Sequence, residues 1–245
     1  MIKATKGIKH TMMRQLFSAL CGLSLMGAGM AVAQSVPGVV VELYTSQGCS
    51  SCPPADAYLA ELALEPGVIP LALHVDYYWD YIGWADQFAQ PKFTDRQKAY
   101  ARTVGSNTIY TPQMIIGGMD RVEGADPERV EGDIRRHQTG SVVTLQLVRR
   151  GETLVITAVA KPPLTAPVHV QLVRYNPMQS VSIKHGENAG RVIEYHNIVT
   201  AWSRIGDWPG VADLRMEAPV AGQDPIVVIL QADGPGLIYA AAVLK

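Results

Sequence analysis

The sequence predicts an α/β domain followed by an all-β, sandwich-like domain, and three observations support this fold class. Strand-like and helix-like segments alternate over the first 140 residues. After Gly140 the helical periodicity stops, and short apolar runs separated by Pro and Gly follow. The chain has 245 residues, 48% of them hydrophobic, which is enough to fill one large core or two small ones.

Residues 1–33 have the pattern of a secretory signal peptide. Four basic residues precede an apolar stretch from Leu16 to about Met30, and the small residues Ala31 and Ala33 follow it. The stretch is shorter than the roughly twenty apolar residues that cross a bilayer, so an uncleaved membrane anchor is the less favoured interpretation. We expect cleavage after Ala33 and a periplasmic or secreted protein, with no stable membrane insertion, in a compartment that permits disulfides.

The charge balance argues against a nucleic-acid partner. Lys and Arg total 21 against 22 Asp and Glu, so the chain has no basic surplus to neutralise phosphates. The glycine-flanked segment 186–190 lacks the lysine and the length of a phosphate-binding loop, and we expect a turn there. The sequence therefore predicts neither a nucleic-acid partner nor a cofactor.

The first domain, residues 34–140, begins with a β-branched run from Val39 to Tyr44, which is typical of a strand covered on both faces. A segment rich in Ala, Leu and Glu follows and stops at Pro66–Gly67, which indicates a helix. We expect strands over 39–44, 68–75, 114–116 and 121–123, and helices over 53–64, 93–104 and 126–138.

The second domain, residues 141–245, has few helical signals. Its apolar runs alternate with polar residues, as in antiparallel sheets. We expect strands over 142–148, 154–160, 168–175, 192–202, 226–231 and 237–244. This spacing predicts a small β-sandwich packed beside the first domain.

Cys49 and Cys52 form a Cys-x-x-Cys pair between the first strand and the first helix, while Cys21 lies in the expected signal peptide. Because backbone amides and the dipole at a helix N-terminus favour a thiolate, we expect Cys49 to attack and Cys52 to resolve a mixed disulfide. A structural staple is the alternative, but closing so short a loop stabilises by only about 2 kcal/mol. Structural zinc needs four ligands, and these are the only two thiolates of the mature chain.

Thr111 and Pro112 directly precede the third expected strand, a setting in which a cis peptide bond is tolerated. The order of strand, Cys-x-x-Cys, helix, strand, helix, Thr-Pro, hairpin and helix resembles the thioredoxin superfamily. That resemblance implies a thioredoxin-like domain in which cis-Pro112 shields the sulfurs and the Thr111 backbone pairs with an extended substrate.

The same resemblance implies an acid beneath the dithiol that accepts a proton. Glu42, on the preceding strand, is the candidate, and a surface Glu is the alternative. Trp79 and Trp84 follow the second strand, where we expect loops to reach the dithiol. They either form apolar platforms in a groove for a substrate peptide or simply cover an unusual loop.

Four longer motifs resemble one family of exported bacterial proteins, catalogued as domain of unknown function 1223. They are YTSQGCSSCPPAD (44–56), HVDYYWDYIGW (74–84), YTPQ (110–113) and GENAG (186–190). One departure is visible, because residues 77 and 78 are both Tyr where the family pattern has one. The resemblance covers nearly all of the chain after residue 33, but the family name implies no activity.

We expect a thiol–disulfide oxidoreductase that acts on protein thiols or disulfides through Cys49 and Cys52. The dipeptide between them, Ser50–Ser51, matches neither common reductants nor strong oxidants and leaves the direction open. One alternative is a periplasmic copper(I)-binding protein or metallochaperone in which His74 completes the site. Another is a non-catalytic binding module with a structural disulfide.

Overall fold

The computed structural model describes residues 36–78 and 83–245. The expected signal peptide and Trp79 lie outside these residues. The helices are α1 (Pro53–Leu62), α3 (Pro91–Thr103) and α4 (Pro127–Gln138). The strands are β1 (Val36–Pro37), β2 (Val39–Thr45), β3 (Val68–His74), β4 (Gln113–Ile116), β5 (Asp120–Glu123), β6 (Val143–Arg150), β7 (Thr153–Ala160), β8 (Val168–Ser182), β9 (Val192–Trp208), β10 (Leu214–Pro219), β11 (Ile226–Ala232) and β12 (Ile238–Leu244).

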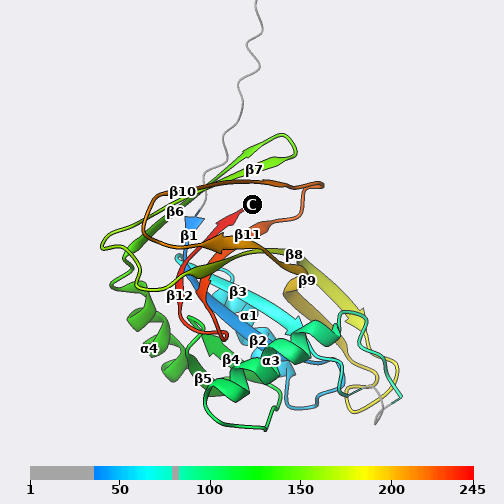
Figure 1. Ribbon diagram of the computed structural model, residues 1–245. Helices are drawn as coiled ribbons and strands as arrows, with labels where there is room; N and C mark the ends of the chain where they lie inside the picture. Colours follow the sequence, from blue (N-terminus) through cyan, green and yellow to red (C-terminus); the bar gives the residue numbers. More distant parts are fainter. Residues whose placement is uncertain (1–35, 79–82) are drawn as a thin grey trace, which may run out of the picture. The chain divides into compact units, whose positions relative to one another are not determined.

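The strands form a nine-stranded mixed sheet and a three-stranded antiparallel sheet (Figure 1). The large sheet has the order β1-β12-β11-β8-β9-β3-β2-β4-β5, and the small one has the order β10-β7-β6. Strands β2 and β3 are parallel, while β4 pairs with β2 in the antiparallel direction. The segment after residue 140 therefore contributes four strands, β8, β9, β11 and β12, to the sheet that contains β2.

The expected fold class, a thioredoxin-like α/β domain followed by a separate sandwich-like domain, is wrong. Strand β9 pairs in parallel with β3 where Ala72 meets Ile198, so the later strands continue the sheet of the earlier ones. The hairpin of β8 and β9 is also longer than its apolar pattern indicated, with strands of 15 and 17 residues. Long-range strand pairing thus merges the two expected sheets into one large, predominantly β structure.

Both faces of β2 are covered, and every residue of the strand is buried. Val41 and Leu43 face a core formed with α1 and α4, whereas Val40 and Tyr44 face a second core on the α3 side. This matches the sequence-based expectation of a central strand without polar alternation. Glu42 has the same parity as Val40 and Tyr44, so its side chain lies on the α3 side of the sheet.

One end of the sheet gathers segments that are distant in the sequence. The loop after β2 leads into α1, which begins with Pro53 and Pro54 at positions where a missing N–H costs little. The β8–β9 hairpin extends past the neighbouring strands toward this loop (Figure 1). Its outer half packs against Trp84 and Phe88.

Candidate functional site

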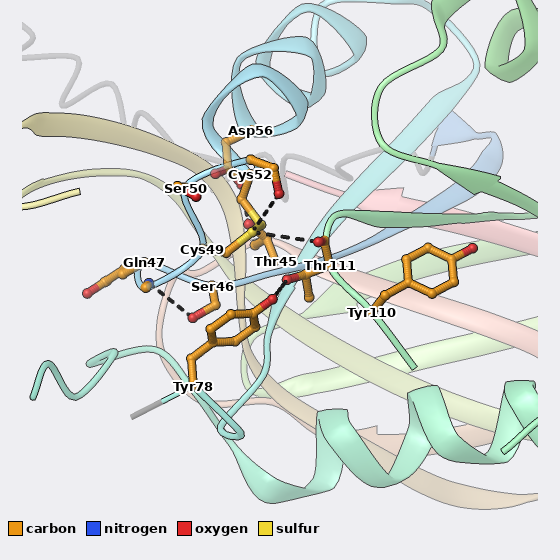
Figure 2. The surroundings of a disulfide bond; sticks show 12 residues. Thr45, Ser46, Gln47, Cys49, Ser50, Cys52, Asp56, Tyr78, Tyr110 and Thr111 are labelled. Carbon is orange, nitrogen blue, oxygen red and sulfur yellow. Dashed lines mark hydrogen bonds between the residues drawn. A yellow bond between two sulfur atoms is a disulfide. The ribbon is translucent and has the colours of Figure 1, made fainter. Parts of the chain in front are cut away.

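Cys49 and Cys52 form a disulfide at the start of α1 (Figure 2). Their Cα atoms are 5.4 Å apart, and Cys52 is the residue that precedes the first turn of the helix. Cys52 is fully buried and Cys49 is 2% exposed, while Ser50 and Ser51 between them are exposed. Both cysteines are therefore buried beneath the exposed Ser50 and Ser51, and the attacking role of Cys49 stays a prediction.

The segment around Pro112 reaches the disulfide, as the sequence predicted. The Thr111–Pro112 peptide bond is cis, and the Thr111 carbonyl oxygen lies 3.7 Å from the Cys49 sulfur. Thr111 also donates a hydrogen bond from its hydroxyl to the Tyr78 hydroxyl, at 2.8 Å (Figure 2). The hydroxyl of Ser51 lies 3.4 Å from the same sulfur and can donate to it.

The backbone around Cys49 offers fewer amide donors than the Cys-x-x-Cys motif suggested. Pro53 and Pro54 have no N–H group. The N–H of Ser50 is taken by the Glu187 carboxylate at 3.2 Å, and that of Cys49 itself by a carbonyl in the same loop at 3.1 Å. Stabilisation of a Cys49 thiolate therefore depends on Ser51 and on the helix dipole more than on free amides.

Glu42 does not join the disulfide. Its carboxylate accepts two hydrogen bonds of 2.7 Å from Arg96 and one of 2.7 Å from the Tyr100 hydroxyl. The Arg96 guanidinium also stacks on Trp202, with its central carbon 4.0 Å from the ring centroid. Glu42 is thus one partner of a buried ion pair that joins β2 to α3, on the face of the sheet opposite α1.

A different acid, Asp56, lies beside the disulfide on α1 (Figure 2). Its backbone N–H donates to the carbonyl of Cys52 at 3.0 Å, and its carboxylate accepts a hydrogen bond of 2.8 Å from Thr45. Burial raises the pKa of Asp56 to about 7, although His74 and the Thr45 hydroxyl act in the opposite direction. Sequence reasoning missed this residue, but the signal was present, because Asp56 follows Cys52 by one helical turn next to the buried positions of α1.

His74 and Asp86 form a buried pair at the end of β3. Their Nδ1 and Oδ2 atoms are 2.7 Å apart, and the same carboxylate oxygen accepts the N–H of Gln47 at 2.8 Å. Burial opposes the charged form of both groups. Each nevertheless favours the ionised form of the other, so the pKa of His74 is raised and that of Asp86 is lowered. The loop that carries Cys49 is thereby fixed to β3.

Trp84 lies near the disulfide loop, as expected. Its indole N–H donates to the Gln47 side chain at 2.8 Å. A pocket of about 220 Å³ lies beside this contact, and Trp84, Tyr78, Ser46 and Asp86 are among the residues that line it. Neither cysteine lines this pocket, and the expected groove for a substrate peptide stays a prediction.

The glycine-flanked segment 186–190 is a turn, as predicted, but it also docks on the disulfide loop. The Asn188 side-chain amide donates to the backbone carbonyls of Gln47, at 3.0 Å, and of Cys49, at 2.9 Å. Arg191 in turn donates to the Asn188 side-chain oxygen at 3.0 Å. Asn188 is only 2% exposed although it lies at a hairpin tip, so the tip is part of the site.

The copper alternative required His74 to approach the cysteines. Among the described residues, no group of three or more His, Cys, Asp or Glu side chains is arranged to hold a metal ion. His74 instead uses its Nδ1 atom for Asp86. In the same part of the chain, no helix has the length and apolarity needed to cross a bilayer.

Comparison with known proteins places these features in a family. The family model described as a protein of unknown function, DUF1223, matches residues 40–231. A crystal structure of a structural-genomics target protein from Agrobacterium tumefaciens is 32% identical, covers 86% of this chain and 96% of its own, and superposes with a TM-score of 0.72. HBP35 of Porphyromonas gingivalis is 14% identical, with a TM-score of 0.58 over 85% of this chain and 74% of its own, and shares the fold alone. No curated protein matches. The chain therefore belongs to the DUF1223 family, whose function is unknown.

Proposed function

We propose that this protein is an exported thiol–disulfide oxidoreductase that exchanges its Cys49–Cys52 disulfide with the thiols of other proteins. The observation that carries the proposal is the position of the buried carboxyl of Asp56, which lies one helical turn after Cys52 beside the disulfide (Figure 2). With its pKa raised to about 7 by burial, this carboxyl both holds and releases a proton near neutral pH.

The exchange proceeds in two steps. A substrate thiolate attacks the Cys49 sulfur, forming a mixed disulfide, while the Cys49–Cys52 bond breaks and its electron pair leaves on Cys52. Protonated Asp56 supplies the proton that converts the Cys52 thiolate to a thiol. A second substrate thiolate then attacks the substrate sulfur of the mixed disulfide and releases Cys49, so that the substrate is oxidised and the protein is reduced. The reverse sequence reduces a substrate disulfide.

A purely structural disulfide explains the site less well. A loop as short as 49–52 stabilises a fold by only about 2 kcal/mol in the chain-entropy model. A structural role for the disulfide also gives no reason to bury a carboxyl beside the sulfurs, since burying an acid raises its pKa and costs stability at neutral pH. The periplasm or another oxidising compartment, reached through the expected signal peptide over 1–33, is part of this proposal.

The test is covalent capture in the native compartment. A Cys52→Ser variant of the full chain retains the attacking sulfur but cannot resolve a mixed disulfide, so we expect adducts that a reducing agent releases. The matched control, Cys49→Ser, keeps only Cys52, which we expect to resolve rather than attack, and should form none. Equal adduct formation by the two variants, or none by either, would contradict the proposal.

A further inference from the structure

Five buried side-chain polar atoms within residues 36–78 and 83–245 lack a hydrogen-bond partner among the protein groups. Four of them belong to residues near the disulfide. These four atoms are Gln47 Nε2, Asp56 Oδ2, His74 Nε2 and Tyr195 Oη. Buried polar atoms in folded proteins are nearly always satisfied, so a group of four in one region indicates a bound molecule.

Independent contacts bring the four residues together. The His74 and Tyr195 rings are 5.0 Å apart between centroids. The charges of Asp56 and His74 influence each other, and Asp56 also contributes to the raised pKa of Tyr195, whose main cause is burial. Gln47 is joined through its backbone N–H to Asp86, which binds His74. The atoms come from the loop after β2, from α1, from the end of β3 and from β9.

The chemistry of the four atoms fits a water molecule. Gln47 Nε2 donates, an ionised Asp56 accepts, and the Tyr195 hydroxyl and the His74 Nε2 atom do either according to their protonation. A buried water makes two to four hydrogen bonds to groups of this mixed kind. A metal ion fits poorly, because the amide nitrogen of Gln47 carries hydrogens and cannot act as a ligand.

We propose that a water molecule binds between Asp56, His74, Gln47 and Tyr195 and carries protons between Asp56 and the His74–Asp86 pair. This inference rests on the proposed exchange reaction, in which Asp56 gives a proton to Cys52. The water then gives a proton to Asp56 and takes one from the His74 imidazolium. The solvent restores the proton of His74, so that the relay returns to its starting state. His74 is accordingly a positioning residue.

Asp86 provides the outer end of this path. His74 is fully buried, but the side chain of Asp86 is 5% exposed and lines the pocket of about 220 Å³ next to Ser46 and Trp84. The Asp86 carboxylate also raises the pKa of His74 against the effect of burial, which favours the imidazolium, the form that donates a proton. The groups that face His74 are thus Asp86, Asp56 and the rings of Phe88 and Tyr195.

The test uses the oxidised protein without its signal peptide and dithiothreitol, with the concentration of the dithiothreitol thiolate held constant as pH varies. The rate of reduction should fall as Asp56 loses its proton near pH 7. Tyr195→Phe removes one hydroxyl without changing a charge, and His74→Gln removes the imidazole. Each should move the midpoint to higher pH, by at least about half a unit, because each substitution removes a group that stabilises the Asp56 anion.

The matched control is His137→Gln, which removes a histidine that is also paired with an aspartate, Asp120, at 2.7 Å but lies on α4. The relay would be overturned if the pH profile of disulfide reduction had the same midpoint in Tyr195→Phe and His74→Gln as in the control. A crystal structure with a direct Asp56–His74 hydrogen bond, or with a metal ion at this point, would overturn the water. Either result leaves the capture by Cys52→Ser intact, so failure of the relay and failure of the exchange activity are distinguishable.

Discussion

Asn188 donates a hydrogen bond of 2.9 Å to the carbonyl oxygen of Cys49, from a position 139 residues later in the chain. A second bond from the same amide reaches the Gln47 carbonyl at 3.0 Å. Both carbonyls belong to the loop that carries the disulfide. The hairpin of β8 and β9 therefore holds this loop in place.

Asn188→Ala should destabilise the protein and expose the disulfide. Two buried carbonyls lose their donor, which costs about 1–3 kcal/mol of unfolding free energy. Reduction of the disulfide by dithiothreitol should also become faster, because the loop is released. Urea unfolding and the reduction rate measure the two effects. Asn176→Ala is the control, because the side-chain bonds of Asn176 stay within the same hairpin. A reduction rate that matches the control would show that the hairpin tip does not restrict access.

Asp56→Asn should change how stability depends on pH. Burial raises the pKa of Asp56 to about 7 in the folded protein, against an ordinary value of 3.8. Between these values the folded protein binds more protons than the unfolded chain, so the contribution of Asp56 to stability is lost as pH rises from about 4 to about 7. Three pKa units correspond to roughly 4 kcal/mol.

The Asn side chain does not titrate. The stability of the variant relative to that of the original protein should therefore increase as pH rises from 5 to 8. The gain, of the order of a few kcal/mol, is measured by urea unfolding at the two pH values. Titration of groups distant from Asp56 is common to both proteins and cancels in the comparison. His74 does not cancel fully, because Asp56 helps to raise its pKa and the substitution removes that charge. The same stability difference at pH 5 and at pH 8 would show that Asp56 does not titrate in this range.

Glu42→Gln should destabilise the fold without changing the chemistry of the disulfide. The substitution leaves the Arg96 charge buried without its carboxylate partner, which costs about 3 kcal/mol or more. The pH profile of disulfide reduction should stay unchanged, because Glu42 lies on the opposite face of the sheet. A shifted profile would instead support the proton-accepting role that the thioredoxin resemblance implied for Glu42.

Local sequence patterns were sufficient to find most elements and part of the site. The helix expected over 126–138 is α4 (Pro127–Gln138), because Asp126 accepts the Arg129 N–H and a proline opens the first turn. The Cys-x-x-Cys pair and Thr111–Pro112 are local signals of the same kind, and the structure brings them together.

What the sequence did not reveal depends on contacts between distant segments. The parallel pairing of Ala72 with Ile198 joins β3 to β9, and no local pattern specifies which strand edges meet. The docking of Asn188 is of the same kind. Glu42 is different, since the two-residue alternation of β2 already places it on the face of Val40 and Tyr44 rather than that of α1.

Glu187→Gln should lower the pKa of the Cys49 thiol in the reduced protein. The Glu187 carboxylate accepts the Ser50 N–H at 3.2 Å, so it places a negative charge on the residue that follows Cys49 and uses an amide that could otherwise stabilise the thiolate. Removing the charge favours ionisation of Cys49, by about half a pKa unit because solvent screens exposed charges. The rate of iodoacetamide alkylation as a function of pH, measured in the Cys52→Ser background, reports this pKa. Glu194→Gln, whose carboxylate pairs with His196 on β9, is the control. If the Cys49 pKa is the same in the Glu187→Gln variant and in the Glu194→Gln control, the hairpin tip restrains the loop sterically and has no electrostatic influence on the attacking sulfur.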